Sequence, residues 1–150
     1  MIEINEITKL SNPEETVDKR TTYLMTKNPD MTSIKDVEDG TQLDITHVCR
    51  FTDTNKDGNE VEIETYLDVN GNVYATQSAT FKEYFDDICN IFLGEDVSII
   101  KKSGKTNAGR DYVYCTLAQG NKNILDIYMF LSNAPTKNGR GIPIYTDWSE

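Results

Sequence analysis

The feature that most constrains this chain is a change in the spacing of its apolar residues near residue 78. Before that point, apolar and polar residues alternate in segments 42–51, 61–69 and 73–76, which is typical of half-buried strands. An Asn-Gly pair between the second and third segments favours a tight hairpin turn. After that point, the apolar residues recur at the spacing of an amphipathic helix. These residues are Phe81, Phe85, Ile88 and Phe92.

The sequence also predicts where this helix begins and ends. Thr80 and Glu83 have the spacing of a capping box, and Gly94 suits the end of a helix. Strand-like alternation then returns in segments 96–102 and 111–118. The order of three strands, one helix and two strands is that of an OB barrel, which places its helix between strands 3 and 4. The sequence therefore predicts a mainly β protein with a five-stranded OB-like barrel.

The chain divides into three parts by pattern. Residues 1–40 are polar and have no sustained period, so we expect an irregular or short-helical N-terminal segment. Residues 41–131 hold the predicted OB-like domain. Residues 132–150 include Pro135 and Pro143 and are expected to form an extended tail. A length of 150 residues fits one such domain with its tails.

Composition favours a cytoplasmic protein without a membrane partner. No segment approaches the roughly 18 apolar residues of a membrane span, and the acidic N-terminus does not have the pattern of a secretory signal. Cys49, Cys89 and Cys115 are odd in number and lie in apolar surroundings, so we expect buried, reduced thiols. A zinc site is not expected, because His47 is the single histidine.

The charge of the chain is unevenly distributed. The formal net charge is -10, which argues against a general nucleic-acid binder. Residues 1–100 hold 8 Lys and Arg against 21 Asp and Glu, whereas residues 101–150 hold 7 against 4. The sequence therefore predicts an acidic body with a local basic patch.

One segment has the spacing of a calcium-binding loop. Asp53, Asn55, Asp57 and Gly58 are followed by Glu64 at the twelfth position, as in an EF-hand. An EF-hand needs a helix on each side, whereas both flanks here alternate like strands. Asp, Asn and Gly also suit a hairpin turn, because they tolerate left-handed backbone. We interpret the segment as a polar β-turn, with weak calcium binding by the same turn as the alternative.

No motif indicates catalysis. The stretch 103–106 resembles part of a phosphate-binding loop, but Ile99 stands where that motif needs its first glycine. His47 falls on the apolar side of a strand and is expected to be a packed side chain. No partner for nucleophilic catalysis accompanies it. We therefore expect no enzymatic activity, no cofactor and no metal.

Basic and aromatic residues gather in the last two predicted strands. Arg110, Tyr112 and Tyr114 stand two residues apart, so in a strand they would point to the same face. Three lysines precede them across a turn. Cations that follow phosphates and rings that stack on bases are the two parts of a single-strand-binding surface. The alternative is that the tyrosines fill the barrel and the lysines belong to a solvated turn. The candidate nucleic-acid-binding residues are Arg50, Tyr66, Tyr74, Lys101, Lys102, Lys105, Arg110, Tyr112 and Tyr114.

The segments 66–92 and 97–117 carry a further pattern: a hairpin with Asp-x-x-Gly-x-x-Tyr, a Ser-x-Thr-Phe entry to a helix, and a Gly-Lys-x-x-x-Gly-Arg turn. Its positions are Asp68, Gly71, Tyr74, Ser78, Thr80, Phe81, Gly104, Gly109 and Arg110. In this pattern, residues 31–118 resemble small single-stranded DNA-binding proteins of bacteriophages that infect Gram-positive bacteria. The N-terminal segment and the tail after residue 132 lie outside the pattern.

The resemblance implies an OB-like fold and a role in phage DNA replication or recombination. It also implies non-catalytic, cooperative coating of single strands in the cytoplasm of the host cell. The partners it implies are single-stranded DNA and replication or host proteins. A homo-oligomer is compatible with the sequence.

An acidic interaction protein is the alternative function. Its carboxylates would occupy a basic groove on a host nucleic-acid-binding protein, in the manner of a DNA mimic or inhibitor. A row of acidic side chains along one predicted strand favours this alternative: Glu60, Glu62, Glu64 and Asp68.

Overall fold

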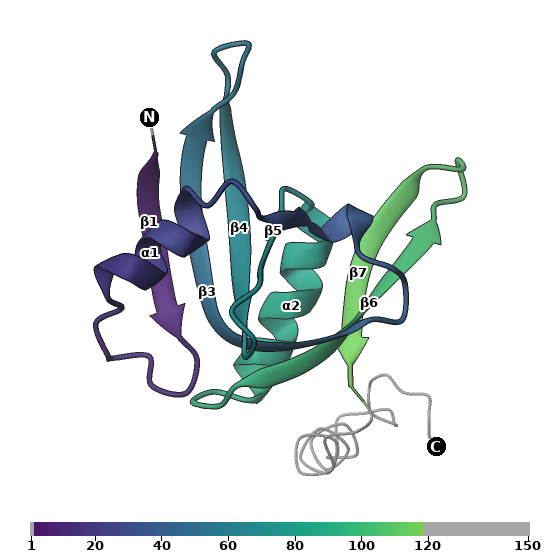
Figure 1. Ribbon diagram of the computed structural model, residues 1–150. Coiled ribbons are helices and arrows are strands. Elements are labelled where there is room, and N and C mark those ends of the chain that lie inside the picture. The colour runs from purple at the N-terminus through teal and green to yellow at the C-terminus, as the bar shows by residue number, and fades with distance from the viewer. Residues whose placement is uncertain (1, 119–150) are drawn as a thin grey trace. The chain divides into compact units, whose positions relative to one another are not determined.

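The computed structural model describes residues 2–118 (Figure 1). These residues form seven strands: β1 (Glu3–Lys9), β2 (Thr32–Ser33), β3 (Gln42–Thr54), β4 (Glu60–Asp68), β5 (Val73–Thr76), β6 (Val97–Lys105) and β7 (Asp111–Leu117). They also form helices α1 (Lys19–Thr26) and α2 (Ala79–Ile91) and the 3-10 turn η1 (Ile34–Asp36). None of the helices described is long and apolar enough to cross a membrane.

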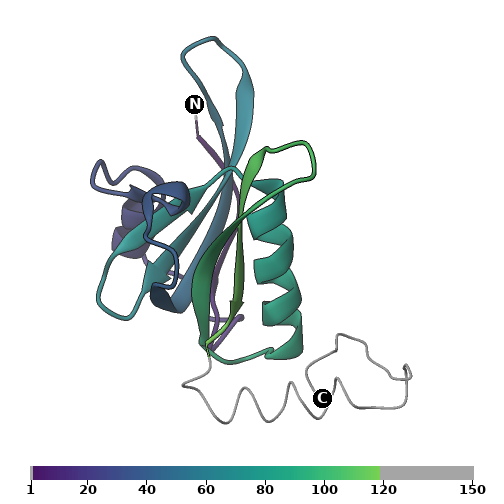
Figure 2. The same cartoon turned by 90° about the vertical axis from the view of Figure 1, so that its right-hand side faces the viewer.

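Strand β3 is the centre of the sheet. The strand order is β2-β5-β4-β3-β6-β7, and β1 also pairs with β3. β4 pairs along one edge of β3, while β6 and β1 share the other edge, at residues 42–45 and 47–52 respectively. These pairs are antiparallel, and only the short β2–β5 pair is parallel. The sheet curls into a half-barrel with α2 against it (Figures 1 and 2).

A break in register divides β3. Ile45 is opposite Asp68, but His47 is opposite Leu67, so one extra residue stands on β3. Such a bulge bends a strand and changes which face its later side chains occupy. Beyond it, Val48 is opposite Tyr66 on one face, while Cys49 packs in a cluster with Met25 of α1 on the other. The simple alternation predicted for segment 42–51 therefore does not continue through the strand.

Helix α2 packs on the Tyr66 face. Its fully buried Phe81 and Phe85 contact the Tyr66 ring, with centroid distances of 5.5 and 4.6 Å. Each such burial stabilises the fold by about 1.5–3 kcal/mol. The predicted capping box is wrong: the N-cap is Ser78, two residues before Thr80, and its hydroxyl accepts from the Phe81 amide at 3.1 Å. The predicted end is confirmed, because Gly94 follows the helix with a φ of 81°.

The prediction of a mainly β protein is confirmed, but its strand count is wrong. Seven strands replace five, and α2 follows the fifth strand rather than the third. The difference comes from residues 1–40: they contain the short helix α1, as expected, but they also contribute the strands β1 and β2. β1 pairs along β3, so residue 40 is not a boundary of the sheet. Residues 119–131 of the predicted domain and the predicted tail lie outside the described residues.

The segment that resembles a calcium loop is the tip of the β3–β4 hairpin. The Asn55 side-chain oxygen accepts from the Asp57 and Asn59 amides at 2.9 and 3.0 Å, and Gly58 has a φ of 83°. Glu64 lies in β4, where it is buried. The prediction of a polar β-turn is confirmed. Within residues 2–118, no group of three or more His, Cys, Asp or Glu side chains is placed to hold a metal ion.

Candidate nucleic-acid interface

The β6–β7 hairpin brings together part of the predicted basic and aromatic set. Lys102 is directly opposite Tyr114, and Gly104 is opposite Tyr112. Directly opposed residues of an antiparallel pair point to the same face, as do residues two apart on one strand. Lys102, Tyr112 and Tyr114 therefore share one face of the hairpin. Arg110, which is exposed, has the same parity and directly precedes β7.

Helix α2 adds a third ring to the two on β7. The Tyr84 and Tyr114 rings lie 5.3 Å apart at an interplanar angle of 48°, and the Tyr114 and Tyr112 rings lie 5.7 Å apart at 32°. Tyr84 is 43% exposed, and the other two are half-buried. We call Tyr84, Tyr112 and Tyr114 the aromatic strip. Its rings are too close together to hold a base between them, so a base would stack on their open faces.

A glycine on β6 fixes the position of one ring. A Cβ atom placed at Gly104 would lie 2.7 Å from the ring carbon Cζ of Tyr112. That distance is shorter than any ordinary contact, so the Tyr112 ring can lie across β6 at this point only because residue 104 has no side chain.

The charges of the hairpin divide between two faces. Among residues 2–118, no ion pair involves Lys102 or Arg110, and both lie on the side of the aromatic strip. Lys105 has the opposite parity and pairs with Asp111 at 2.6 Å, with both side chains exposed. Lys102 and Arg110 are therefore the two cations placed to contact phosphates beside the strip.

The structure corrects the prediction for Lys101, which is buried. Its ammonium donates to the Val37 carbonyl and to the Asp39 carboxylate, each at 2.7 Å. Ser103 also donates to Asp39 at 2.7 Å. Lys101 thus holds the loop before β3 against β6 and does not face solvent. The sequence did not predict the burial of Lys101, because a cluster of basic residues does not show which of its lysines is buried.

Tyr66 is also not a stacking residue. Its side chain is fully buried against α2, and its hydroxyl donates to Glu64 at 2.5 Å. Burial raises the pKa of Tyr66 well above its ordinary value, and the neighbouring Glu64 charge adds to this. The alternative expected for the tyrosines, that they fill the interior, therefore holds for Tyr66.

Tyr74 lies on β5, away from the aromatic strip in strand order. It is opposite Tyr66 and half-buried, and its hydroxyl donates to Asp68 at 3.5 Å. Strands β4, β3 and β6 stand between β5 and β7 in the sheet. The pairing of strands therefore does not bring Tyr74 into the set formed by the β6–β7 hairpin.

Arg50 is held by three carboxylates and is not a free cation. Its Nε donates to Glu64 at 2.5 Å, and its two terminal nitrogens donate to Glu6 and Asp86. Burial lowers the pKa of Arg50, but the charges of Glu64 and Asp86 outweigh that effect and raise the pKa above its ordinary value. The prediction that Arg50 contacts nucleic acid is therefore corrected. Its role is to join β1, β3, β4 and α2.

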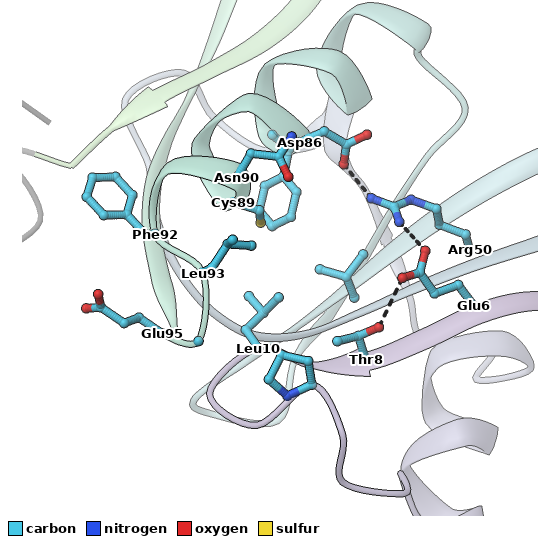
Figure 3. Close-up of a pocket in the computed structure, with 14 residues that line it drawn as sticks. Glu6, Thr8, Leu10, Arg50, Asp86, Cys89, Asn90, Phe92, Leu93 and Glu95 are labelled. Atoms are coloured by element: carbon cyan, nitrogen blue, oxygen red, sulfur yellow. Dashed lines mark hydrogen bonds and ion pairs between the residues drawn. The ribbon is translucent and has the colours of Figure 1, made fainter. Parts of the chain in front are cut away.

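A pocket of about 360 Å³ lies beside this arginine (Figure 3). Arg50, Glu6 and Asp86 line one side of it, and apolar side chains such as Leu10 and Leu93 line the other. Because the guanidinium is already bound on three sides, the pocket does not present a cation to a phosphate. We therefore do not include it in the interface.

His47 and the three cysteines are packed side chains rather than reactive groups. His47 is half-buried, its Nδ1 lies 2.8 Å from the Thr46 hydroxyl, and burial lowers its pKa. Burial raises the pKa of Cys49 to about 11 and that of Cys89 to about 12, and the pKa of Cys115 is also raised by burial. Thiols with such pKa values are weak nucleophiles. All three are free; Cys49 and Cys115 are buried, as predicted, whereas Cys89 is half-buried.

Sequence reasoning missed Tyr84. It lies on α2 three residues after Phe81, on the exposed part of the helix, and the helical spacing alone gives it no special role. Its place in the strip depends on the packing of α2 beside β7, which a single sequence does not reveal.

No family model, curated protein or solved structure matches this chain.

Proposed function

We propose that this protein binds single-stranded DNA without sequence preference and performs no catalysis. The observation that supports this most is the pairing of Lys102 with Tyr114 across β6 and β7, with Tyr84 and Tyr112 extending the strip on either side. A cation beside a row of partly exposed rings is the arrangement that single strands require. As the resemblance implies, the activity would support phage DNA replication or recombination.

The strand order supports an OB-like fold as part of this proposal. Strands β3, β4 and β5 form a meander, α2 follows, and β6 then returns to pair with the first residues of β3. β7 completes the set by pairing with β6. This is the order of strands and helix in an OB barrel, with β1 and β2 as additions from the N-terminal segment.

The proposed site explains how an acidic chain can bind a single strand. Stacking on an aromatic side chain stabilises binding by about 1–3 kcal/mol per base and does not depend on net charge. At the aromatic strip, Lys102 and Arg110 supply the electrostatic attraction. The rest of the acidic surface repels phosphates and favours a short contact.

The acidic interaction protein is less well supported. Of the four carboxylates in its predicted row, Glu64 and Asp68 are buried. Glu64 is bound to Arg50, and Asp68 accepts from the Asn70 and Asn72 amides in a turn. Only Glu60 and Glu62 are exposed, so the row is not a continuous surface for a basic groove.

The proposal is tested by changing one ring of the strip. Replacement of Tyr114 by Leu removes a stacking surface but keeps an apolar side chain, whereas Tyr23→Leu removes an exposed ring on α1 as a matched control. We expect Tyr114→Leu to weaken binding of a labelled oligo-dT by about 1–3 kcal/mol in fluorescence anisotropy, and Tyr23→Leu to leave it unchanged. Equal affinities for both variants and the wild type would contradict the proposed site.

A further inference from the structure

A groove between β1 and α1 carries positive charge, unlike most of this acidic protein. It has a volume of about 480 Å³, and its lining includes Ile2 and Ile4 beside β3 and Tyr23 on α1. Its charged lining residues are both lysines, Lys19 and Lys27, and no carboxylate lines it. On a chain with a net charge of -10, such a groove is a local exception.

The groove is open to solvent, and no carboxylate that lines it neutralises its two lysines. Ile4 is 43% exposed and Tyr23 is 54% exposed, although large apolar side chains usually lie inside. Within residues 2–118, neither Lys19 nor Lys27 takes part in an ion pair. Both lysines are exposed. The groove thus offers apolar contact and positive charge together.

The β3–β4 hairpin has the opposite character. Its pairing continues to Thr54 and Glu60, and its tip extends beyond the neighbouring strands (Figures 1 and 2). Asp57, Glu60 and Glu62 are exposed, and none of them forms an ion pair within the described part of the chain. Glu60 and Glu62 are two apart on β4 and point to one face, while half-buried Val61 between them points to the other.

We propose that the groove binds the acidic β3–β4 hairpin of a second copy of this chain. Lys19 and Lys27 would face Glu60 and Glu62 of the partner copy, while Ile4 and Tyr23 would contact the methylene groups of the same two glutamates. Opposite charges at such a contact steer association and select the partner. Exposed ion pairs are weak and are screened by salt, so the association is strongest at low salt. This inference does not depend on DNA binding.

The test uses two charge-reversed variants of the full chain. The groove variant is Lys19→Glu with Lys27→Glu, and the hairpin variant is Glu60→Lys with Glu62→Lys. The mass of each is measured by sedimentation velocity over a range of protein concentrations at low salt. We expect the wild type to associate with increasing concentration, and each variant alone to remain monomeric because its groove and hairpin repel each other.

Mixing the two variants is the decisive step. The acidic groove of one variant then meets the basic hairpin of the other, and the remaining groove and hairpin keep their wild-type charges. We expect the equimolar mixture to associate as the wild type does. Control variants with the same number of reversals elsewhere should also associate as the wild type does. These controls are Lys35→Glu with Lys105→Glu, and Glu14→Lys with Glu38→Lys.

Two results would overturn the inference. One is a wild type that stays monomeric at low salt at every concentration. The other is a mixture that associates no more than the separate variants, provided that circular dichroism shows both to be folded. Weaker oligo-dT binding by the groove variant, without any change in mass, would instead make the groove a DNA contact and also overturn the proposal.

Discussion

The Nε atom of Arg50 lies 2.5 Å from a carboxylate oxygen of Glu64, whose side chain is 1% exposed. The other oxygen of Glu64 accepts from the Tyr66 hydroxyl. This pair is the point at which the added strand β1 and helix α2 are joined to the central sheet, through Glu6 and Asp86. Residues that looked like parts of a DNA-binding surface therefore hold the fold together.

Removal of Arg50 should destabilise the protein strongly. Arg50→Gln leaves Glu64 buried without its counter-ion, which costs 3–5 kcal/mol in a fully buried pair, and we expect about 2–3 kcal/mol because Arg50 is half-exposed. The free energy of unfolding is measured by urea titration. The matched control is Lys105→Gln, which breaks an exposed pair and should cost less than about 1 kcal/mol. Equal costs for both variants would contradict a structural role for Arg50.

Glu64 should make stability depend on pH in an unusual direction. Burial raises the pKa of Glu64 above its ordinary value of 4.5, although Tyr66 and Arg50 lower it in part. A carboxyl group with a raised pKa binds its proton more tightly in the folded state. The free energy of unfolding should therefore fall as pH rises from 4.5 through the pKa of the folded state.

Comparison with Glu64→Gln isolates this effect. Gln cannot ionise, so the fall in stability above pH 4.5 should be smaller in the variant. Asp39 acts in the opposite direction, because hydrogen bonds from Lys101 and Ser103 lower its pKa from 3.8, and the stability it contributes is lost only as pH falls below that value. Parallel curves for wild type and variant between pH 4.5 and 7 would show that Glu64 does not titrate as described.

Gly104→Ala should disturb the aromatic strip without unfolding the protein. The new methyl group would lie 2.7 Å from the Tyr112 ring and force it to move. We expect a loss of up to about 1–3 kcal/mol in oligo-dT affinity, which corresponds to one stacked base. Ser103→Ala, on the other face of β6, serves as the control. Unchanged affinity in Gly104→Ala, with its fold intact, would show that the position of Tyr112 does not matter for binding.

The two adjacent lysines should behave differently. Lys102→Met should leave stability nearly unchanged and reduce the slope of log affinity against log salt by about 0.7, the value for one phosphate contact on a single strand. Lys101→Met should instead lower the free energy of unfolding, because it removes the donor to the Val37 carbonyl and one of the two donors to Asp39. Urea titration and salt-dependent anisotropy on both variants check this. A salt slope that changes only in Lys101→Met would reverse the assignment.

The sequence predicted the central elements because their patterns are local. The Asn-Gly turn, the alternation in β4 and β7, and the spacing of Phe81 and Phe85 each depend on neighbours within a few residues. β1 was not predicted because a short, polar edge strand has little periodicity. Its pairing with β3 joins residues 38 to 49 positions apart, and a local sequence pattern does not reveal such a pairing.

The candidate site was predicted only in part for a related reason. The alternation of side chains along a strand correctly placed Tyr112 and Tyr114 on one face, and that face also holds Lys102. This alternation does not tell which face of a sheet is buried, so Tyr66 and Lys101 were assigned to the surface. Charge alone likewise does not show that Arg50 already has three carboxylate partners.

The most direct test of the account is the binding of labelled oligo-dT and of a duplex of the same length, measured by anisotropy at several salt concentrations. We predict tighter binding to the single strand, with a slope of log affinity against log salt of about -1.4 for contacts by Lys102 and Arg110. Absence of binding to oligo-dT at low salt, or equal affinity for the duplex, would contradict the proposed function.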